Sequence, residues 1–241
     1  MVSATDPLAL SVFHSTGLAI IERFLDAHVV AGLIESIESL PPDQFADRKR
    51  RGVVFARRNL LNPDFIQSLL QRPAITDLVK AIAADAIPAR AMLFDKTGAA
   101  NWTVPWHQDR SIMVARRIDV AGFGPWSVKG GIVHVQPPIE ILRQMVTIRL
   151  HLDSCNADNG LLRVIEGTHQ RILEPSEIDT AVASREVLEC ATSAGGLVIM
   201  RPLILHSSAP AKAPTHRRII HIEFGPRDLP SPVEWAHAAK S

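Results

Sequence analysis

Two side chains that bind metals stand one residue apart near the middle of the sequence. His107 and Asp109 lie in the segment 102–112, which reads WTVPWHQDRSI. Residues i and i+2 of an extended strand point to the same face, so the imidazole and the carboxylate would lie side by side. This donor pair suits Fe(II) in a site of two histidines and one carboxylate. A hydrogen-bonded surface pair is the alternative, so the metal interpretation requires a third ligand.

His206 is the best candidate for that third ligand. It follows the apolar run 203–205 and precedes two serines, so it would lie where a strand opens into a loop. A metal site needs rigid backbone behind its ligands and open space in front of them. His221, in the last predicted strand, is the competing candidate.

Arg217 begins that last strand, in which alternate side chains differ in character. The segment 217–224 reads RRIIHIEF, and alternation places Arg217, His221 and Glu223 on one face. A guanidinium that points into a protein interior needs a carboxylate, which it can bind through two parallel hydrogen bonds. Beside a metal ligand, Arg217 would therefore anchor a dicarboxylate. A register shift of one residue would give this role to Arg218.

These motifs resemble the phytanoyl-CoA dioxygenase-like family. The resemblance rests on PWHQD at 105–109, on NGLLRVIEGTH at 159–169, and on His206 with Ser208 and Arg217. It also includes the N-terminal sequence GLAIIERFL, so it covers nearly the whole chain. Members of this family are Fe(II)- and 2-oxoglutarate-dependent oxygenases on a double-stranded β-helix.

The resemblance implies an oxygenase and its metal ligands. His107, Asp109 and His206 would hold Fe(II), and the enzyme would use O2 and 2-oxoglutarate to hydroxylate an unactivated carbon of a small organic molecule, releasing succinate and CO2. Relatives that halogenate carry a small residue in place of the carboxylate, so Asp109 favours hydroxylation, with desaturation and ring closure left open. Glu166 replaces a proline common in the family, a departure confined to one turn.

The resemblance also implies a site for the cosubstrate. Arg217 would bind the distal carboxylate of 2-oxoglutarate, and Ser208 would hydrogen-bond nearby. Lys96, at the end of the strand expected over 89–96, is a further candidate for cosubstrate binding. A solvated lysine at a strand end is the alternative there.

The order of the predicted elements indicates an α+β, mainly β, protein. Residues 1–88 would form a mostly helical scaffold, with one helix after Asp26 and a second one broken at Pro73. Short strands separated by turns follow over 89–226. They would close into a double-stranded β-helix, a cupin-like jelly roll, with the N-terminal helices packed on one sheet. We expect residues 1–241 to form a single domain.

Two connecting segments stand out. The segment 115–142 is long for a loop, and we expect it to form a lid rather than a plain surface crossover. As a hypothesis, Trp126 and Lys129 contact the primary substrate, and Trp106 helps to wall the pocket. The basic segment 47–58 is expected to be a solvated loop, with an anion-binding role as the alternative.

Composition narrows the possible partners to small molecules. The formal net charge of +1 and the absence of tyrosine argue against nucleic acid and anionic membranes as partners. No apolar run reaches the ~20 residues that span a bilayer, and two cysteines make no disulfide framework, so a cytoplasmic protein is expected. The sequence predicts no oligomeric state. Two alternative functions stay open, a cupin-like metal-dependent isomerase or hydrolase and a non-catalytic jelly-roll binding module.

Overall fold

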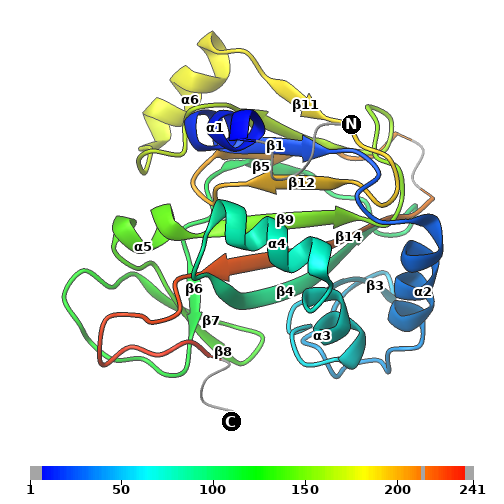
Figure 1. Cartoon of the computed structure of the whole chain (residues 1–241), viewed down its shortest axis with the longest axis horizontal. Coiled ribbons are helices and arrows are strands. Elements are labelled where there is room, and N and C mark those ends of the chain that lie inside the picture. Colours follow the sequence, from blue (N-terminus) through cyan, green and yellow to red (C-terminus); the bar gives the residue numbers. More distant parts are fainter. Residues whose placement is uncertain (1–6, 213–214, 237–241) are drawn as a thin grey trace.

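Two facing antiparallel sheets form the centre of the structure (Figure 1). The computed structural model describes residues 7–212 and 215–236. Strand order in the larger sheet is β1-β12-β9-β14-β4-β3-β2, and in the smaller sheet it is β11-β10-β13-β5. Buried side chains of both sheets, such as Val198 of the larger and Val164 of the smaller, meet in one apolar cluster. This arrangement confirms the predicted double-stranded β-helix.

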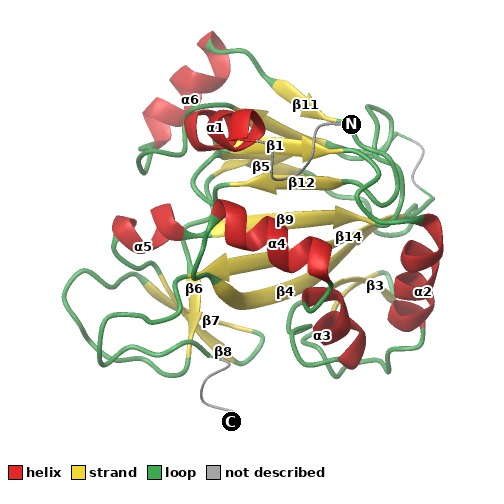
Figure 2. Ribbon diagram, in the orientation of Figure 1, coloured by secondary structure: helices red, strands yellow, loops and turns green. Residues whose placement is uncertain are grey.

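The strands are short and separated by turns and helices (Figure 2). Those of the larger sheet are β1 (Leu18–Ile21), β2 (Arg48–Arg50), β3 (Val53–Arg57), β4 (Ile87–Lys96), β9 (Val146–His151), β12 (Leu197–Met200) and β14 (Arg217–Gly225). Those of the smaller sheet are β5 (Val104–His107), β10 (Leu162–Ile165), β11 (Leu188–Cys190) and β13 (Leu205–Ser208). A third sheet, in the order β6-β8-β7, consists of β6 (Ile112–Val114), β7 (Trp126–Lys129) and β8 (Ile132–Val135).

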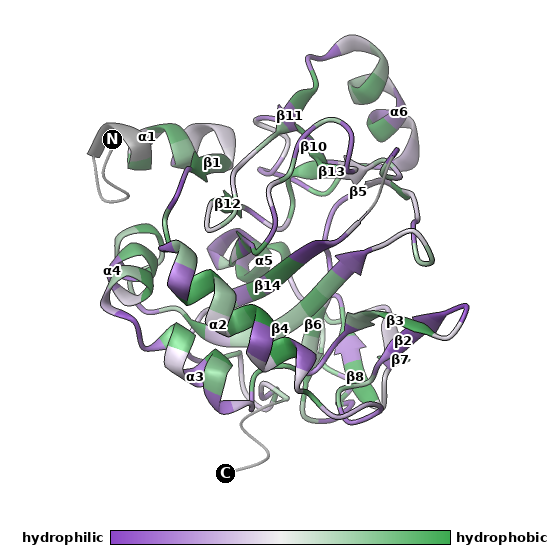
Figure 3. Ribbon diagram, turned by 90° about the vertical axis from the view of Figure 1, so that its right-hand side faces the viewer, coloured by the Kyte–Doolittle hydropathy of each residue, from purple (hydrophilic) through white to green (hydrophobic). Residues whose placement is uncertain are grey.

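Helices cover the outer face of the larger sheet, as the sequence predicts. They are α1 (Pro7–Thr16), α2 (Ala27–Glu38), α3 (Asp64–Leu70) and α4 (Pro73–Ile82). Two later helices pack elsewhere: α5 (Ile139–Gln144) joins the apolar cluster of the third sheet, and α6 (Pro175–Ser184) packs on the smaller sheet. The apolar faces of α2, α3 and α4 pack on outward-facing side chains of β9 and β14, including Leu150 and Ile222. Figure 3 shows the three helices together on one side of β4 and β14. The break between α3 and α4 falls at Pro73, as predicted.

The central strand β14 separates the helical layer from the cavity. Its even-numbered residues Ile220, Ile222 and Phe224 join the apolar cluster under the helices. Alternation sends Arg217 and His221 to the opposite face, where both line a cavity between the sheets. The predicted face assignment of this strand is therefore confirmed.

Three segments differ from the sequence predictions. The helix α1 was not predicted, because its sequence lacks a pronounced apolar face. The basic segment 47–58 is a β-hairpin, β2 and β3, that extends the larger sheet, so the expectation of a loop was wrong. The segment 115–142 contains β7, β8 and most of α5, so it is not a long loop either.

No helix in the described part of the chain is long and apolar enough to cross a membrane.

Burial of the outer face of β9 should dominate the stability of the larger sheet. Leu150→Ala removes a side chain that is 1% exposed and packed under the helices. We expect a loss of about 2–5 kcal/mol in the free energy of unfolding, measured by urea denaturation. Leu188→Ala on β11, where the side chain is 37% exposed, is the matched control and should cost below about 1 kcal/mol. Equal losses for the two variants would contradict this packing.

Candidate active site

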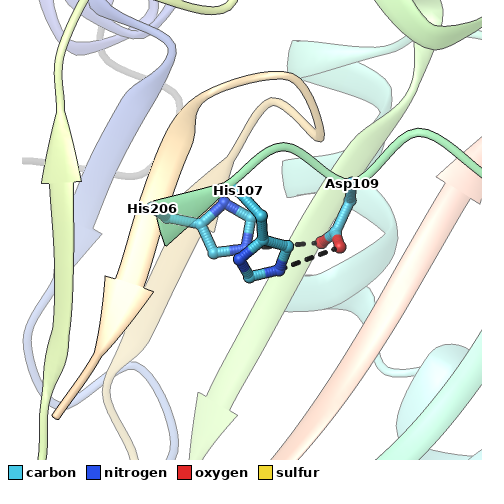
Figure 4. Close-up of side chains that lie close together, drawn as sticks. All are labelled: His107, Asp109 and His206. Carbon is cyan, nitrogen blue, oxygen red and sulfur yellow. Dashed lines mark ion pairs between the residues drawn. The ribbon is translucent and has the colours of Figure 1, made fainter. Parts of the chain in front are cut away.

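Two paired strands of the smaller sheet bring the predicted metal ligands together. Antiparallel pairing of β5 with β13 places His107 directly opposite His206. Asp109 lies two residues beyond the end of β5, where its backbone N–H donates to the carbonyl of Pro202. The Nε2 atom of His107 is 3.5 Å from the Asp109 carboxylate, and that of His206 is 3.6 Å from it. Figure 4 shows both rings directed at this carboxylate.

Backbone carbonyls orient both histidine rings. His107 Nδ1 is 2.8 Å from the carbonyl of Pro105, and His206 Nδ1 is 2.8 Å from that of Ile204. A carbonyl only accepts, so each Nδ1 carries the proton and each Nε2 presents a lone pair. Such hydrogen bonds fix the tautomer and the direction of a metal-binding imidazole. The geometry therefore suits two nitrogen ligands at one point.

Gln108, between His107 and Asp109, holds this part of the chain in place. Its side-chain amide donates to the carbonyls of Leu203, at 2.6 Å, and Arg171, at 2.8 Å, and its oxygen accepts the N–H of Leu173 at 2.8 Å. Sequence reasoning missed this residue, because a glutamine beside two ligands carries no signal of its partners. Its position on the opposite side of the strand from His107 follows from alternation alone.

The charges of the three ligands suit a divalent cation. Burial alone would raise the pKa of Asp109, but the facing His206 and His107 outweigh it and hold that pKa well below its usual range. Burial lowers the pKa of His206 to about 4, so this ring is neutral at pH 7. Burial also opposes the protonation of His107, while its contact with Asp109 outweighs that effect and raises its pKa. An ionised carboxylate between two imidazoles is the donor set that Fe(II) takes in facial sites.

Arg217 and Ser208 line the same cavity as the trio, and they meet the buried Lys96 at Ser208. Lys96 Nζ donates to Ser208 Oγ at 2.8 Å and to the carbonyl of Ala209 at 2.5 Å. Arg217 donates to the carbonyl of Gly160 and, at 3.3 Å, to Ser208 Oγ. The register of β14 on β4 places Arg217 directly opposite Lys96, which explains the meeting. The three predicted cosubstrate residues thus form one cluster.

Arg149 on β9 adds a third buried cation, which sequence reasoning missed. It is 7% exposed, and its guanidinium is 3.0 Å from His221 Nδ1. Burial, followed by the charge of Arg217, lowers the pKa of Arg149 to about 10. Its signal in the sequence is an arginine amid the apolar strand residues 145–150, because a buried guanidinium needs a partner.

The two alternatives that the sequence left open are resolved by these contacts. Arg218 points away from the cavity, and its guanidinium binds Asp153 at 2.9 Å and Glu38 at 2.8 Å. His221 is held between Arg149 and Glu223, with Nε2 3.3 Å from the Glu223 carboxylate. Arg217 rather than Arg218 therefore faces the cavity, and His206 rather than His221 joins His107 and Asp109.

One cavity of about 280 Å³ contains the ligand trio and the inner end of the cation cluster. Lys129 lines it as well, together with the apolar side chains of Phe94 and Trp102. Trp126 does not line it and packs instead on the apolar cluster beneath the third sheet, with Arg117 over its ring at 5.8 Å. Trp106 points to the other face of β5, where it packs against Leu205 and lies 5.5 Å below Arg163.

The residues present fit a mononuclear iron site. The two nitrogens and the carboxylate oxygen lie within 4.8 Å of one another, and no other group of this kind occurs among the described residues. The side chains of His107 and Asp109 are 37% and 33% exposed, so one side of the trio opens to the cavity. A catalytic metal requires such an open side for substrate and oxidant. Fold and site together define a jelly-roll protein with a candidate metal site beside a cluster of buried cations.

The comparison with protein families names the class more closely. The model of the phytanoyl-CoA dioxygenase family matches residues 13–219. The chain therefore belongs to this family of Fe(II)- and 2-oxoglutarate-dependent oxygenases. Its cofactors are Fe(II), the cosubstrate 2-oxoglutarate and O2. No curated protein sequence matches the chain.

Solved structures share the fold at low sequence identity. AviO1 from Streptomyces viridochromogenes Tue57 is 23% identical, with a TM-score of 0.66 over 93% of this chain and 97% of that one. EctD from S. alaskensis, solved with 2-oxoglutarate and 5-hydroxyectoine, is 14% identical, with a TM-score of 0.73 over 93% of this chain and 77% of that one. The α-ketoglutarate-dependent epimerase SnoN from nogalamycin biosynthesis is 15% identical, with a TM-score of 0.66 over 91% and 82%.

Removing the carboxylate of the trio should abolish tight binding of a divalent metal. We expect Asp109→Ala to weaken Co(II) binding to the metal-free protein by more than about tenfold, because one of three ligands and its negative charge are lost. Isothermal titration calorimetry measures the change. Asp119→Ala, at an exposed aspartate that pairs with Arg117, is the control and should leave affinity unchanged. Equal affinities for both variants would exclude the trio as the metal site.

Proposed function

We propose that the protein hydroxylates an unactivated carbon of a small organic molecule, with His107, Asp109 and His206 as the ligands of Fe(II). The observation that carries the proposal is that these three donors line one cavity with Arg217 and Ser208, and that Lys96 donates to Ser208. A metal trio alone would also suit a cupin-like isomerase or hydrolase. A buried anion pocket beside the trio favours an enzyme that uses a dicarboxylate cosubstrate.

The chemistry of the loaded site can be written as a balanced reaction. When bound, iron and 2-oxoglutarate activate O2, so that R–H, 2-oxoglutarate and O2 yield R–OH, succinate and CO2. One oxygen atom enters succinate and the other enters the product. The four electrons that reduce O2 come from 2-oxoglutarate and from the C–H bond in equal shares.

The protein's own residues position the reactants and set their charges. Arg217 would clamp the distal carboxylate of 2-oxoglutarate, while Ser208 and Lys96 add donors at its side. Asp109 stays ionised and keeps a carboxylate at the metal, where halogenating relatives have a small residue. The apolar walls Phe94 and Trp102 would limit water near the reacting carbon. These roles together favour hydroxylation.

Anaerobic addition of Fe(II) and 2-oxoglutarate tests this function directly. We expect the visible charge-transfer band of a chelated ketoacid, and succinate after air is admitted. Arg217→Met should lose the band at 2-oxoglutarate concentrations that saturate the wild type. Arg218→Met is its matched neighbour, with a guanidinium outside the cavity, and should keep the band. A wild-type protein without the band and without succinate would refute the oxygenase proposal.

Isotope labelling tests hydroxylation once a substrate is known. One atom of 18O from 18O2 in the product would support hydroxylation, and a product without 18O would refute hydroxylation.

Lys96 should make cosubstrate binding depend on pH. Burial, then the charges of Arg217 and Arg149, lowers the pKa of Lys96 to about 7 in the free protein. A bound carboxylate favours the ammonium form, so above pH 7 binding must take up a proton. We expect the affinity for 2-oxoglutarate to be flat below pH 7 and to fall by up to about tenfold per pH unit above it. Titrations of the charge-transfer band between pH 6 and 8.5 measure this slope.

The variant Lys96→Met tests whether Lys96, rather than another titratable group, causes this pH dependence. It should bind 2-oxoglutarate more weakly at pH 6.5 and lose the slope above pH 7. Lys212→Met, at an exposed lysine paired with Asp158, should behave as the wild type. An unchanged slope in Lys96→Met would show that Lys96 does not contact the cosubstrate.

A further inference from the structure

Three basic side chains line the cavity in addition to the buried cations Arg149 and Arg217. Arg58 follows directly on β3, Arg90 lies on β4, and Lys129 is the last residue of β7. Arg58 is half-buried and Lys129 is exposed, so this group lies toward the mouth of the cavity. The mechanism described above uses none of the three.

Two hairpins hold this part of the cavity wall together. Arg58 ends the hairpin β2–β3, and its backbone N–H donates to the carbonyl of Phe45 at 2.7 Å. Lys129 pairs with Ile132 in the hairpin β7–β8. The turn of the second hairpin lies against the segment that leads into β2, because a Cβ added to Gly130 would come within 2.7 Å of Ala46. Figure 3 shows β2, β3, β7 and β8 gathered on one side of the molecule.

Positive charge exceeds negative charge in this cavity. Five cationic side chains line it, against the two carboxylates of Asp109 and Glu223 in the described part of the chain. Glu223 accepts from Arg90 at 3.3 Å and from His221 at the same distance, so Arg90 has a carboxylate partner. Neither Arg58 nor Lys129 forms an ion pair with a described residue. Their two charges remain without a partner at the mouth.

Burial and mutual repulsion lower the pKa values of Arg58 and Lys129. Burial lowers the pKa of Lys129, and the charges of Arg90 and Arg58 lower it further. Burial likewise lowers the pKa of Arg58, with Arg48 and Arg90 adding to it. His134 on β8, buried beside the group, has its pKa lowered to about 4 by burial and then by Arg90 and Lys129. Like charges held together in this way are stabilised by an anion that binds between them.

We propose that Arg58 and Lys129, with Arg90 behind them, form a binding subsite for an anionic group of the primary substrate, a carboxylate or a phosphate. The subsite shares its cavity with the metal trio, so an anion held there would place the adjoining carbon chain toward His107 and Asp109. The proposal rests on the proposed function, because it assigns the class of substrate that the oxygenase takes. The subsite is separate from the inner cations, which would bind the cosubstrate.

Binding of small anions near a paramagnetic metal tests the subsite. The probes are inorganic phosphate, [13C]acetate and the neutral [13C]acetamide, added to the Mn(II)-loaded protein with saturating 2-oxoglutarate. Nuclear relaxation of 31P and 13C reports binding close to Mn(II). We expect saturable enhancement for phosphate, acetate or both, and none for acetamide. Which anion responds distinguishes a phosphate subsite from a carboxylate subsite.

Two double variants, each of which removes two positive charges, test whether the anion binds at Arg58 and Lys129. The double variant Arg58→Gln/Lys129→Gln should raise the apparent Kd of the responding anion at least about tenfold, as expected for the loss of two charge-assisted contacts. The control Arg116→Gln/Lys212→Gln removes the same charge from two exposed residues outside the cavity and should leave Kd unchanged. No anion response, an equal response to acetamide, or an unchanged Kd in the first double variant would each overturn the subsite.

A second readout separates this proposal from the oxygenase function. The Fe(II) and 2-oxoglutarate charge-transfer band should persist in Arg58→Gln/Lys129→Gln, which shows that the variant is folded and its cosubstrate site intact. A band in the wild type without an anion response refutes the subsite alone. Absence of the band in the wild type refutes the oxygenase function, whatever the anions do.

Discussion

The register of β14 between β4 and β9 is the constraint on which the cavity depends. It places Arg217 opposite Lys96 and His221 opposite Arg149. A shift by one residue would turn the polar side chains of β14 toward the helices and its isoleucines into the cavity. The register is held because Ile220, Ile222 and Phe224 on the other face complete the core under α2, α3 and α4. The helical scaffold thus determines the chemistry of the cavity through the strand between them.

Burying three cationic side chains at the inner end of the cavity costs free energy. Lys96, Arg149 and Arg217 are at most 7% exposed, and their hydrogen-bond partners are neutral groups: backbone carbonyls, a serine hydroxyl and an imidazole. Neutral acceptors satisfy the N–H groups, yet they do not cancel the charge. A dianionic cosubstrate would supply that cancellation. Binding of the dianion would relieve the repulsion between the buried cations, which favours specific and tight binding.

The two ends of the cavity are built by different kinds of structure. The two histidines of the metal trio and the inner cations come from paired strands of the two main sheets, and Asp109 lies two residues beyond the end of β5, where its N–H donates to the carbonyl of Pro202. Of the basic groups toward the mouth, Arg90 lies on β4, whereas Arg58 follows the hairpin β2–β3 and Lys129 lies on the third sheet. Residues on such flanking elements can vary without disturbing the central sheets. This division fits a common reaction centre combined with a substrate site particular to each protein.

The sequence alone determined the local chemistry and the class of fold. A two-residue spacing placed His107 and Asp109 together, alternation along 217–224 put Arg217 and His221 on one face, and Pro73 divided two helices. These features follow from strand and helix periodicity within single segments, so they do not depend on long-range contacts. The family motifs then joined His206 and Arg217 to the first pair.

Only the tertiary structure decided which segments meet. Pairing of β5 with β13, about a hundred residues apart in sequence, selected His206, and the contacts of Arg218 with Asp153 selected Arg217. The same holds for Arg149, for the hairpin formed by 47–58, and for Trp126, which packs below the third sheet away from the cavity. Periodicity assigns a side chain to a face, whereas the partner of that face depends on long-range strand pairing, and a single sequence does not specify that pairing locally.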